Sequence, residues 1–317
     1  MAGWLGTYDF LIVSMTLGAM LALSLYLPLM SGQLSLASPA FYAIGGYIAA
    51  LLSTRVFAGL NPYPVPLVLG EMVLAAMVCG LVGWGIGLPV LRLRGIYFAI
   101  ATIAFSEVLR ILALNLEVTG GAIGIFGIPQ PFSTPLGYLW LTLPLLMMVA
   151  IAIGRLEQTR AGKAMQAIRA DELVAQTLGI DTTRYKVLGF VLGAILAGVA
   201  GVLAAHLLNT WNPRQGTFDT GVLALTAVLV GGNRTFVGAI AGGMLFTALP
   251  ELLRGLADQP YWPAAVATFF RDGRLMLYGL LIILGTRFFP QGLCQAPNWR
   301  SLGGTIFKVK KIRSRHE

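Results

Sequence analysis

The sequence predicts an all-α, polytopic membrane protein with about eight to ten transmembrane helices, some of them broken or half-helices. Hydrophobic residues make up 57% of the 317 residues and charged residues only 11%, whereas a soluble domain typically carries about 25% charged residues. Apolar runs of roughly the 20 residues needed to cross a bilayer recur along the chain. Glycine and proline interrupt several of these runs, which predicts breaks in the helices.

The expected spans begin near the N-terminus. The stretch MAGWLGTYDF has no basic residue, so it lacks the positive region of a cleaved signal peptide and predicts a retained membrane helix. In chain order, the expected spans are 10–30, 35–54, 65–91, 96–115, 136–154, 186–208, 219–232, 235–252 and 274–290. Segment 219–232 is short and ends in two glycines, which favours a half-helix. The glycine-rich segment 35–54 is expected to be broken or partly re-entrant.

Basic residues gather in two places. Six of the 22 lysines and arginines lie between Arg155 and Lys186, and seven lie from Arg287 onward. Because short loops rich in Lys and Arg stay on the cytoplasmic side, both regions are predicted to be cytoplasmic. The tail 293–317 is interpreted as a basic cytoplasmic end that touches solvent or lipid. The formal charge of +9 is therefore no sign of nucleic-acid binding.

Residue types that carry chemistry are scarce. Two cysteines and two histidines are too few for a disulfide framework, a Cys-rich metal site or a histidine cluster. No span carries a Ser–His, paired-Asp or His–metal arrangement, so the sequence predicts neither an enzyme nor a metal site. His206 stands alone at the end of an apolar span and is interpreted as a packing histidine.

A polar segment, RAGKAMQAIRADELVAQTLGID (160–181), interrupts the apolar chain. Ala161, Ala164, Met165 and Ile168 follow the i, i+3, i+4, i+7 spacing of an amphipathic helix. A second short stripe ends before Gly179, a residue suited to a helix C-cap. The pattern predicts two short amphipathic helices whose apolar faces need cover from lipid, from the protein's own helices or from a partner's groove.

Charged residues within spans are functional or paired by default. Glu107 and Arg110 are spaced i, i+3, and Glu251 and Arg254 repeat the spacing, so each pair can neutralise itself on one helix. Each pair is interpreted as an ion pair that fixes helix packing or marks an interface, with a substrate or gating role as the alternative. Glu71 lies near the start of its span and is expected at the membrane interface.

The glycine stretch TGGAIGIFGIP (119–129) is neither a P-loop nor a dinucleotide-binding turn, since both need a strand-to-helix setting. Two interpretations stay open for it. The backbone at Thr119, Gly120 and Gly121 could line a pathway, because irregular backbone at membrane depth must face water or protein. Alternatively, the stretch is an external loop.

Several segments resemble one family in order and spacing. The segment LPVLRLRGIYFAIATIAFSEVLRILALNLEVTGGAIGIFGIP (88–129) resembles the signature of the LivM-type permeases, the membrane subunits of ATP-binding-cassette importers for branched-chain amino acids. The segment SGQLSLASPAFYAIGGYIAALL (31–52) is similar to the same family, as are 160–206, 212–232 and 238–254. The resemblance covers roughly residues 10–292.

The resemblance implies a transmembrane permease domain over 1–292, with a cytoplasmic coupling segment at 155–186 that docks on an ATPase subunit. The coupling residues that it implies are Arg160, Gly162, Met165, Ile168, Arg169, Asp171, Glu172, Ala175, Leu178 and Gly179. It also implies a second permease of similar fold, two cytoplasmic ATPases that bind ATP and Mg, an extracytoplasmic binding protein, and a multi-pass location in the inner membrane. No cofactor is expected in this chain.

Two departures from the family pattern affect local backbone. Gly231-Gly232-Asn233-Arg234 stands where the family often has a Gly-Gly-Leu-Gly turn, and Ser38-Pro39 replaces a commoner small-plus-His pair. Pro39 indicates a kink or half-helix there.

The substrate stays open between leucine-like amino acids and the urea or short amides that related permeases carry. A second class of function, an autonomous secondary transporter, could use Glu107, Glu71 or Glu251 for ion coupling. Such a carrier would not need 160–181 as a docking site, so this segment distinguishes the two classes.

Overall fold

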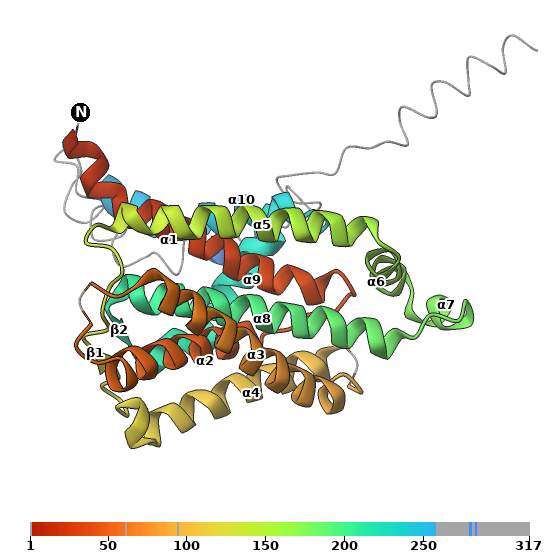
Figure 1. Cartoon of the computed structure of the whole chain (residues 1–317). Helices are drawn as coiled ribbons and strands as arrows, with labels where there is room; N and C mark the ends of the chain where they lie inside the picture. Colours follow the sequence, from red (N-terminus) through yellow and green to blue (C-terminus); the bar gives the residue numbers. More distant parts are fainter. Residues whose placement is uncertain (1, 61, 94, 258–278, 281–282, 284–317) are drawn as a thin grey trace, which may run out of the picture.

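The computed structural model describes residues 2–60, 62–93, 95–257, 279, 280 and 283 (Figure 1). Its helices are α1 (Ala2–Leu29), α2 (Ser38–Leu51), α3 (Val65–Val90), α4 (Ile96–Asn115), α5 (Leu139–Gln158), α6 (Arg160–Ala170), α7 (Glu172–Thr177), α8 (Thr182–Leu208), α9 (Phe218–Gly232) and α10 (Phe236–Ala257). A π-helical turn, η1 (Leu52–Val56), extends α2, and short 3-10 turns form η2 (Glu117–Thr119), η3 (Pro135–Tyr138) and η4 (Pro213–Gly216). The two-residue strands β1 (Ile125–Phe126) and β2 (Thr210–Trp211) pair antiparallel.

The predicted all-α membrane class is confirmed for the described part of the chain. Five segments are long and apolar enough to cross a membrane, namely Tyr8–Leu29, Val65–Val90, Ile96–Asn115, Pro135–Gln158 and Thr182–Leu208. Phe218–Gly232 and Phe236–Leu252 are shorter apolar helices. The expected total of about eight to ten spans is not established by these elements. Apart from residues 279, 280 and 283, the expected span 274–290 and the tail 293–317 lie outside the described residues.

Two short helices, α2 and α9, do not continue from a longer helix: α2 follows the extended residues 33–37, and α9 follows the 3-10 turn η4. Residues 33–37 precede α2 without helical structure, and Pro39 occupies its first turn, where its missing N–H costs nothing. A Cβ added to Gly221 near the start of α9 would lie 3.0 Å from Pro39 Cγ, so the starts of α2 and α9 adjoin. Segment 219–232 therefore lies within a short helix of 15 residues, and segment 35–54 begins with non-helical backbone before α2.

The extended segment before α2 is held by α4. The Leu36 N–H donates to Thr102 Oγ1 at 3.1 Å, and the Ser106 hydroxyl donates to the Leu36 carbonyl at 3.0 Å. Irregular backbone at membrane depth needs such partners, because hydrocarbon offers none. These two bonds fix the segment against the middle of α4.

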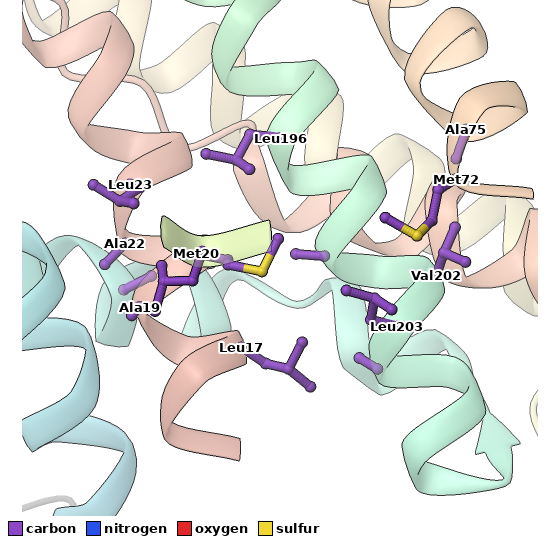
Figure 2. Close-up of a cluster of buried hydrophobic side chains, with 14 of the residues drawn as sticks. Leu17, Ala19, Met20, Ala22, Leu23, Met72, Ala75, Leu196, Val202 and Leu203 are labelled. Carbon is purple, nitrogen blue, oxygen red and sulfur yellow. The ribbon is translucent and has the colours of Figure 1, made fainter. Parts of the chain in front are cut away.

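Close packing on α8 forms the centre of the bundle. A Cβ on Gly45 would lie 1.9 Å from the Gly198 carbonyl oxygen, and one on Gly201 would lie 2.0 Å from the Tyr42 carbonyl oxygen. Only glycine allows α2 and α8 to approach this closely. Figure 2 shows Leu196, Val202 and Leu203 of α8 lying between buried side chains of α1 and of α3. A Cβ on Gly193 would lie 2.5 Å from the Ser24 carbonyl oxygen, so a glycine also permits the close contact of α8 with α1.

The bundle has two distinct ends. Helices α6 and α7 project at one end, and β1, β2 and the N-terminus lie at the other (Figure 1). The glycine stretch 119–129 therefore lies far from α6 and α7.

Candidate functional site

The predicted coupling segment, residues 155–186, contains the two short helices α6 and α7 that its pattern predicts. Thr159 caps α6 by accepting a hydrogen bond from the Gly162 N–H at 3.2 Å. The Asp171 carboxylate caps α7 by accepting from the N–H groups of Leu173 and Val174, at 2.9 and 3.1 Å. Gly179 follows α7 with a φ of +79°, the left-handed conformation that ends helices. Local capping chemistry thus explains why this polar segment is helical.

The two helices differ in what covers their apolar faces. On α6, Met165 and Ile168 are buried, and Met165 belongs to the main core of the protein. Leu173 and Val174 on α7 are 65% and 53% exposed, and Leu178 at its C-cap is 73% exposed. The α6 stripe is therefore covered by the protein's own helices, whereas α7 presents an uncovered apolar surface.

Several predicted coupling residues have structural roles within the chain. Gly162, Met165, Ile168 and Ala175 are buried, Asp171 caps α7 and Gly179 ends it. A Cβ on Gly162 would lie 2.1 Å from the Leu156 carbonyl oxygen, so this glycine permits the tight turn between α5 and α6. Arg160 and Leu178 are exposed, as are the capping residue Asp171 and the terminal residue Gly179.

The remaining two predicted residues make contacts within the chain. Arg169 donates to the Asn233 carbonyl at 2.7 Å, which ties α6 to the turn after α9. Glu172 pairs with Lys186 of α8 at 2.7 Å. Burial lowers the pKa of Arg169, and the nearby cation of Arg234 lowers it further. The guanidinium nevertheless stays protonated at neutral pH.

A cavity of about 290 Å³ lies between α2, α4 and η4, and we name it the Tyr47 cavity. Its wall is mainly apolar, with Ile44, Ile48 and Leu109 among its residues. The Tyr47 hydroxyl is buried and has no hydrogen-bond partner among the described residues. Arg110 and Thr119, two of the predicted pathway candidates, both line this cavity.

Glu107 and Arg110 form the expected pair on α4, with Glu107 Oε2 2.7 Å from Arg110 Nε. Both side chains are 33% exposed, although Glu107 lies about 12 Å from the end of the helix. A charge that faces lipid at the centre of a bilayer costs roughly 2.5–3.5 kcal/mol on the insertion scale. This face of α4 is therefore suited to contact with protein or water, not with lipid.

The other pathway candidates lie in the turn after α4 or on α10. The Thr119 hydroxyl donates to the carbonyls of Ala113 and Leu116, at 2.6 and 2.7 Å, and closes the turn after α4. Gly120 and Gly121 have φ values of +74° and +58° in that turn. Glu251 is exposed on α10, and the side chain of Arg254 lies outside the described residues.

Glu71 and His206 form a contact that the sequence does not reveal. His206 Nε2 lies 2.6 Å from Glu71 Oε2, and the Tyr63 hydroxyl donates to Oε1 at 2.5 Å. His206 Nδ1 lies 2.8 Å from the Pro129 carbonyl oxygen. Exposure is 2% for Glu71 and 0% for His206. The interpretation of His206 as a packing histidine is confirmed, but its partner Glu71 was not predicted, because the contact depends on the packing of α3 on α8.

Among the described residues, no group of three or more His, Cys, Asp or Glu side chains is placed to hold a metal ion. The arrangement instead consists of a projecting helix pair, a mainly apolar cavity and buried polar contacts.

Comparison with known proteins identifies relatives over most of the chain. The family described as branched-chain amino acid transport system / permease component matches residues 7–285. The high-affinity branched-chain amino acid transport system permease protein LivM of Salmonella typhimurium is 33% identical over 294 residues, which cover 83% of this chain and 64% of the relative. The chain thus spans less than two thirds of the length of this relative.

A second type of permease is also similar. The permease protein LivH of Escherichia coli is 29% identical over 285 residues, which cover 84% of this chain and 87% of the relative. The probable LivM of Methanocaldococcus jannaschii is 26% identical over 249 residues, with 71% of this chain and 68% of the relative covered. No solved structure matches the chain.

Proposed function

Because the chain belongs to the family of branched-chain amino acid transport permease components, we propose that it is a membrane-spanning subunit of an ATP-binding-cassette importer for branched-chain amino acids. The observation that carries the proposal is the family match over residues 7–285. This is a family of transport permeases, and the chain itself would carry no covalent chemistry. Residues 1–292 would form the permease domain and 293–317 a basic tail.

Partners follow from the nature of such an importer. Similarity to both LivM and LivH supports a second permease of related fold beside this chain. Two cytoplasmic ATPases would bind ATP and Mg, and an extracytoplasmic binding protein would deliver the amino acid. Membrane lipid would surround the assembly.

The orientation that we propose places α6 and α7 in the cytoplasm, because six basic residues lie in the coupling segment. The β1–β2 end and the N-terminus would then face outward. The basic tail would be cytoplasmic by the same rule.

The pathway that we propose runs along the α4 face that carries the Tyr47 cavity. The partly exposed Glu107–Arg110 pair supports this, since protein or water must cover it. A second permease packed on this face would supply that cover and close the pathway. The apolar wall and the single charged pair suit an apolar amino acid.

The ATPase contact is proposed for the uncovered surface of α7, not for the stripe of α6. Leu173, Val174 and Leu178 form a short apolar surface on the helix farthest from the bundle (Figure 1). A groove on the ATPase that receives an amphipathic helix would bury them. Because α6 is anchored in the core, movement of α7 would be passed to the bundle.

Leu178→Glu tests this contact. We expect the variant to lose ATPase co-purification and leucine uptake by at least tenfold, since truncating or charging an interface anchor typically costs about 2 kcal/mol or more. The variant should still insert in the membrane in normal amount. Reversal of charge at Arg169 and Glu172 would also disturb transport, but both residues have partners within the chain, so Leu178 is the cleaner probe.

Ile123→Glu is the matched control. Ile123 and Leu178 are both 73% exposed, but Ile123 lies in the loop at the opposite end of the bundle. Wild-type uptake and ATPase retention in Leu178→Glu would refute docking through α7, whereas equal losses in both variants would indicate a general defect.

A further inference from the structure

A second cavity, of about 390 Å³, lies beneath the coupling segment, and we name it the Gln33 cavity. It is lined by residues 31–34, by Leu91, Leu93 and Gly95, by the start of α4, by the last turn of α6, and by Glu172 and Lys186. Leu93 and Ile96 on its rim are exposed, so the cavity opens to the surface. Its volume falls within the range of about 300–1,000 Å³ that is usual for small-molecule sites.

Gln33 indicates that this cavity holds a polar ligand. The residue is only 6% exposed, yet neither its amide nitrogen nor its amide oxygen has a hydrogen-bond partner among the described residues. A buried amide without partners is unfavourable, and such groups are normally satisfied. A ligand with both an acceptor and a donor would satisfy the two ends of this amide.

The charges around the cavity carry both signs. Arg169 donates to a backbone carbonyl but has no acidic side chain within ion-pair distance among the described residues. Glu172 and Lys186 pair across the cavity wall at 2.7 Å. A guanidinium with donors to spare is suited to bind a carboxylate, and Glu172 can accept from an ammonium group as well as from Lys186.

The rest of the wall is apolar. Leu91 and Phe98 are buried beside the cavity, and Leu34 and Ile96 continue this surface outward. An uncharged aliphatic side chain would pack there.

We propose that the Gln33 cavity is a binding site for an apolar α-amino acid, with its carboxylate on Arg169, its ammonium group on Glu172 and its side chain against Phe98. The Gln33 amide completes the polar contacts. The site is distinct from the Tyr47 cavity. The first turn of α4 lines the Gln33 cavity, whereas later turns of α4 line the Tyr47 cavity. The hydrogen bonds of Thr102 and Ser106 hold the backbone of Leu36 between the two cavities. That the ligand is also the transported amino acid rests on the proposed function.

The test is isothermal titration of L-leucine into the complete complex, purified in nanodiscs without the binding protein. Gln33→Leu should weaken L-leucine binding about tenfold, which corresponds to about 1.4 kcal/mol. Because this change removes an unpartnered buried amide, it should not unfold the protein. Glu172→Gln is a second variant, for which a similar loss is expected. The probes 4-methylpentanoate and 3-methylbutylamine, which lack the ammonium and the carboxylate, should each bind at least tenfold more weakly than L-leucine.

One control locates the ligand. Gln176→Leu makes the same chemical change at an exposed position of α7 that does not line the Gln33 cavity, so this variant should bind L-leucine as the wild type does. Wild-type affinity in Gln33→Leu, equal weakening in Gln176→Leu, or no binding to the wild type would overturn the proposal.

The same preparation separates this inference from the proposed function. A complete complex without Gln33-dependent binding would refute the site alone. A chain that purifies without ATPases yet binds L-leucine through Gln33 would refute the proposed function and leave the site standing.

Discussion

At the scale of single residues, the contact between Glu71 and His206 is the best-defined polar feature inside the bundle. Both ring nitrogens of the histidine and both carboxylate oxygens have partners within 2.8 Å. A neutral histidine facing a protonated carboxyl, or an imidazolium facing a carboxylate, satisfies these contacts equally, and the pair has no net charge in either form. It can therefore lie at membrane depth, where an unpaired charge is costly.

Replacing Glu71 by leucine should destabilise the protein by about 3–5 kcal/mol, because His206 and Tyr63 would be left buried without their partner. Unfolding in detergent, followed by helical signal against temperature, measures the loss. The double variant Glu71→Leu with His206→Phe should be less destabilised than the single variant, since only the Tyr63 hydroxyl, and no longer His206 as well, is left without its partner. A single variant as stable as the wild type would show that the contact contributes nothing.

This contact also marks the limit of prediction at the residue scale. Glu107 and Arg110 could be paired from the sequence, because a helix places residues three apart on one face. Glu71 and His206 are 135 positions apart, and their contact depends on how α3 packs on α8. Gln33 and Tyr47 are likewise ordinary residues in the sequence, and only burial without partners makes them notable.

At the scale of elements, the spacing of apolar residues predicted where helices form, but not which neighbouring helices cover their apolar faces. The spacing of Met165 and Ile168 predicted an amphipathic helix, and the structure places that apolar face in the protein's own core. The uncovered surface belongs to the second short stripe, on α7 and Leu178, and the spacing alone could not tell which of the two stripes is covered. The broken helices were predictable from Pro39 and the glycine pairs, because these residues act locally. The bonds that hold the extended segment to α4 were not, because they are made between distant parts of the chain.

Gly45→Ala tests the packing of α2 on α8. The added methyl would lie 1.9 Å from the Gly198 carbonyl oxygen, so the helices must separate, at a cost of about 1–3 kcal/mol or more. Gly70→Ala on α3 is the control, because no atom lies within 4 Å of its added methyl and alanine favours the helix. The readout is the unfolding midpoint in detergent. Equal midpoints for the two variants would contradict the packing described for α8.

At the scale of the whole molecule, burial separates a core from a periphery. About two thirds of the span residues are buried in α1 and α8 (67% each), but only 28%, 28% and 22% in α3, α4 and α5. The peripheral helices must face lipid or another protein, and the charged pair on α4 favours protein or water there. Together with the projecting α7, this gives the chain two surfaces that suit partners, as a subunit of an importer requires.

The most direct test of the importer account is gentle detergent purification of the tagged chain from its native membrane, followed by mass spectrometry of the proteins that accompany it. We predict an ATPase and a second, related permease in stoichiometric amounts, with the ATPase lost from the Leu178→Glu variant. A chain that purifies alone, or only with copies of itself, would contradict the importer account and favour an autonomous carrier.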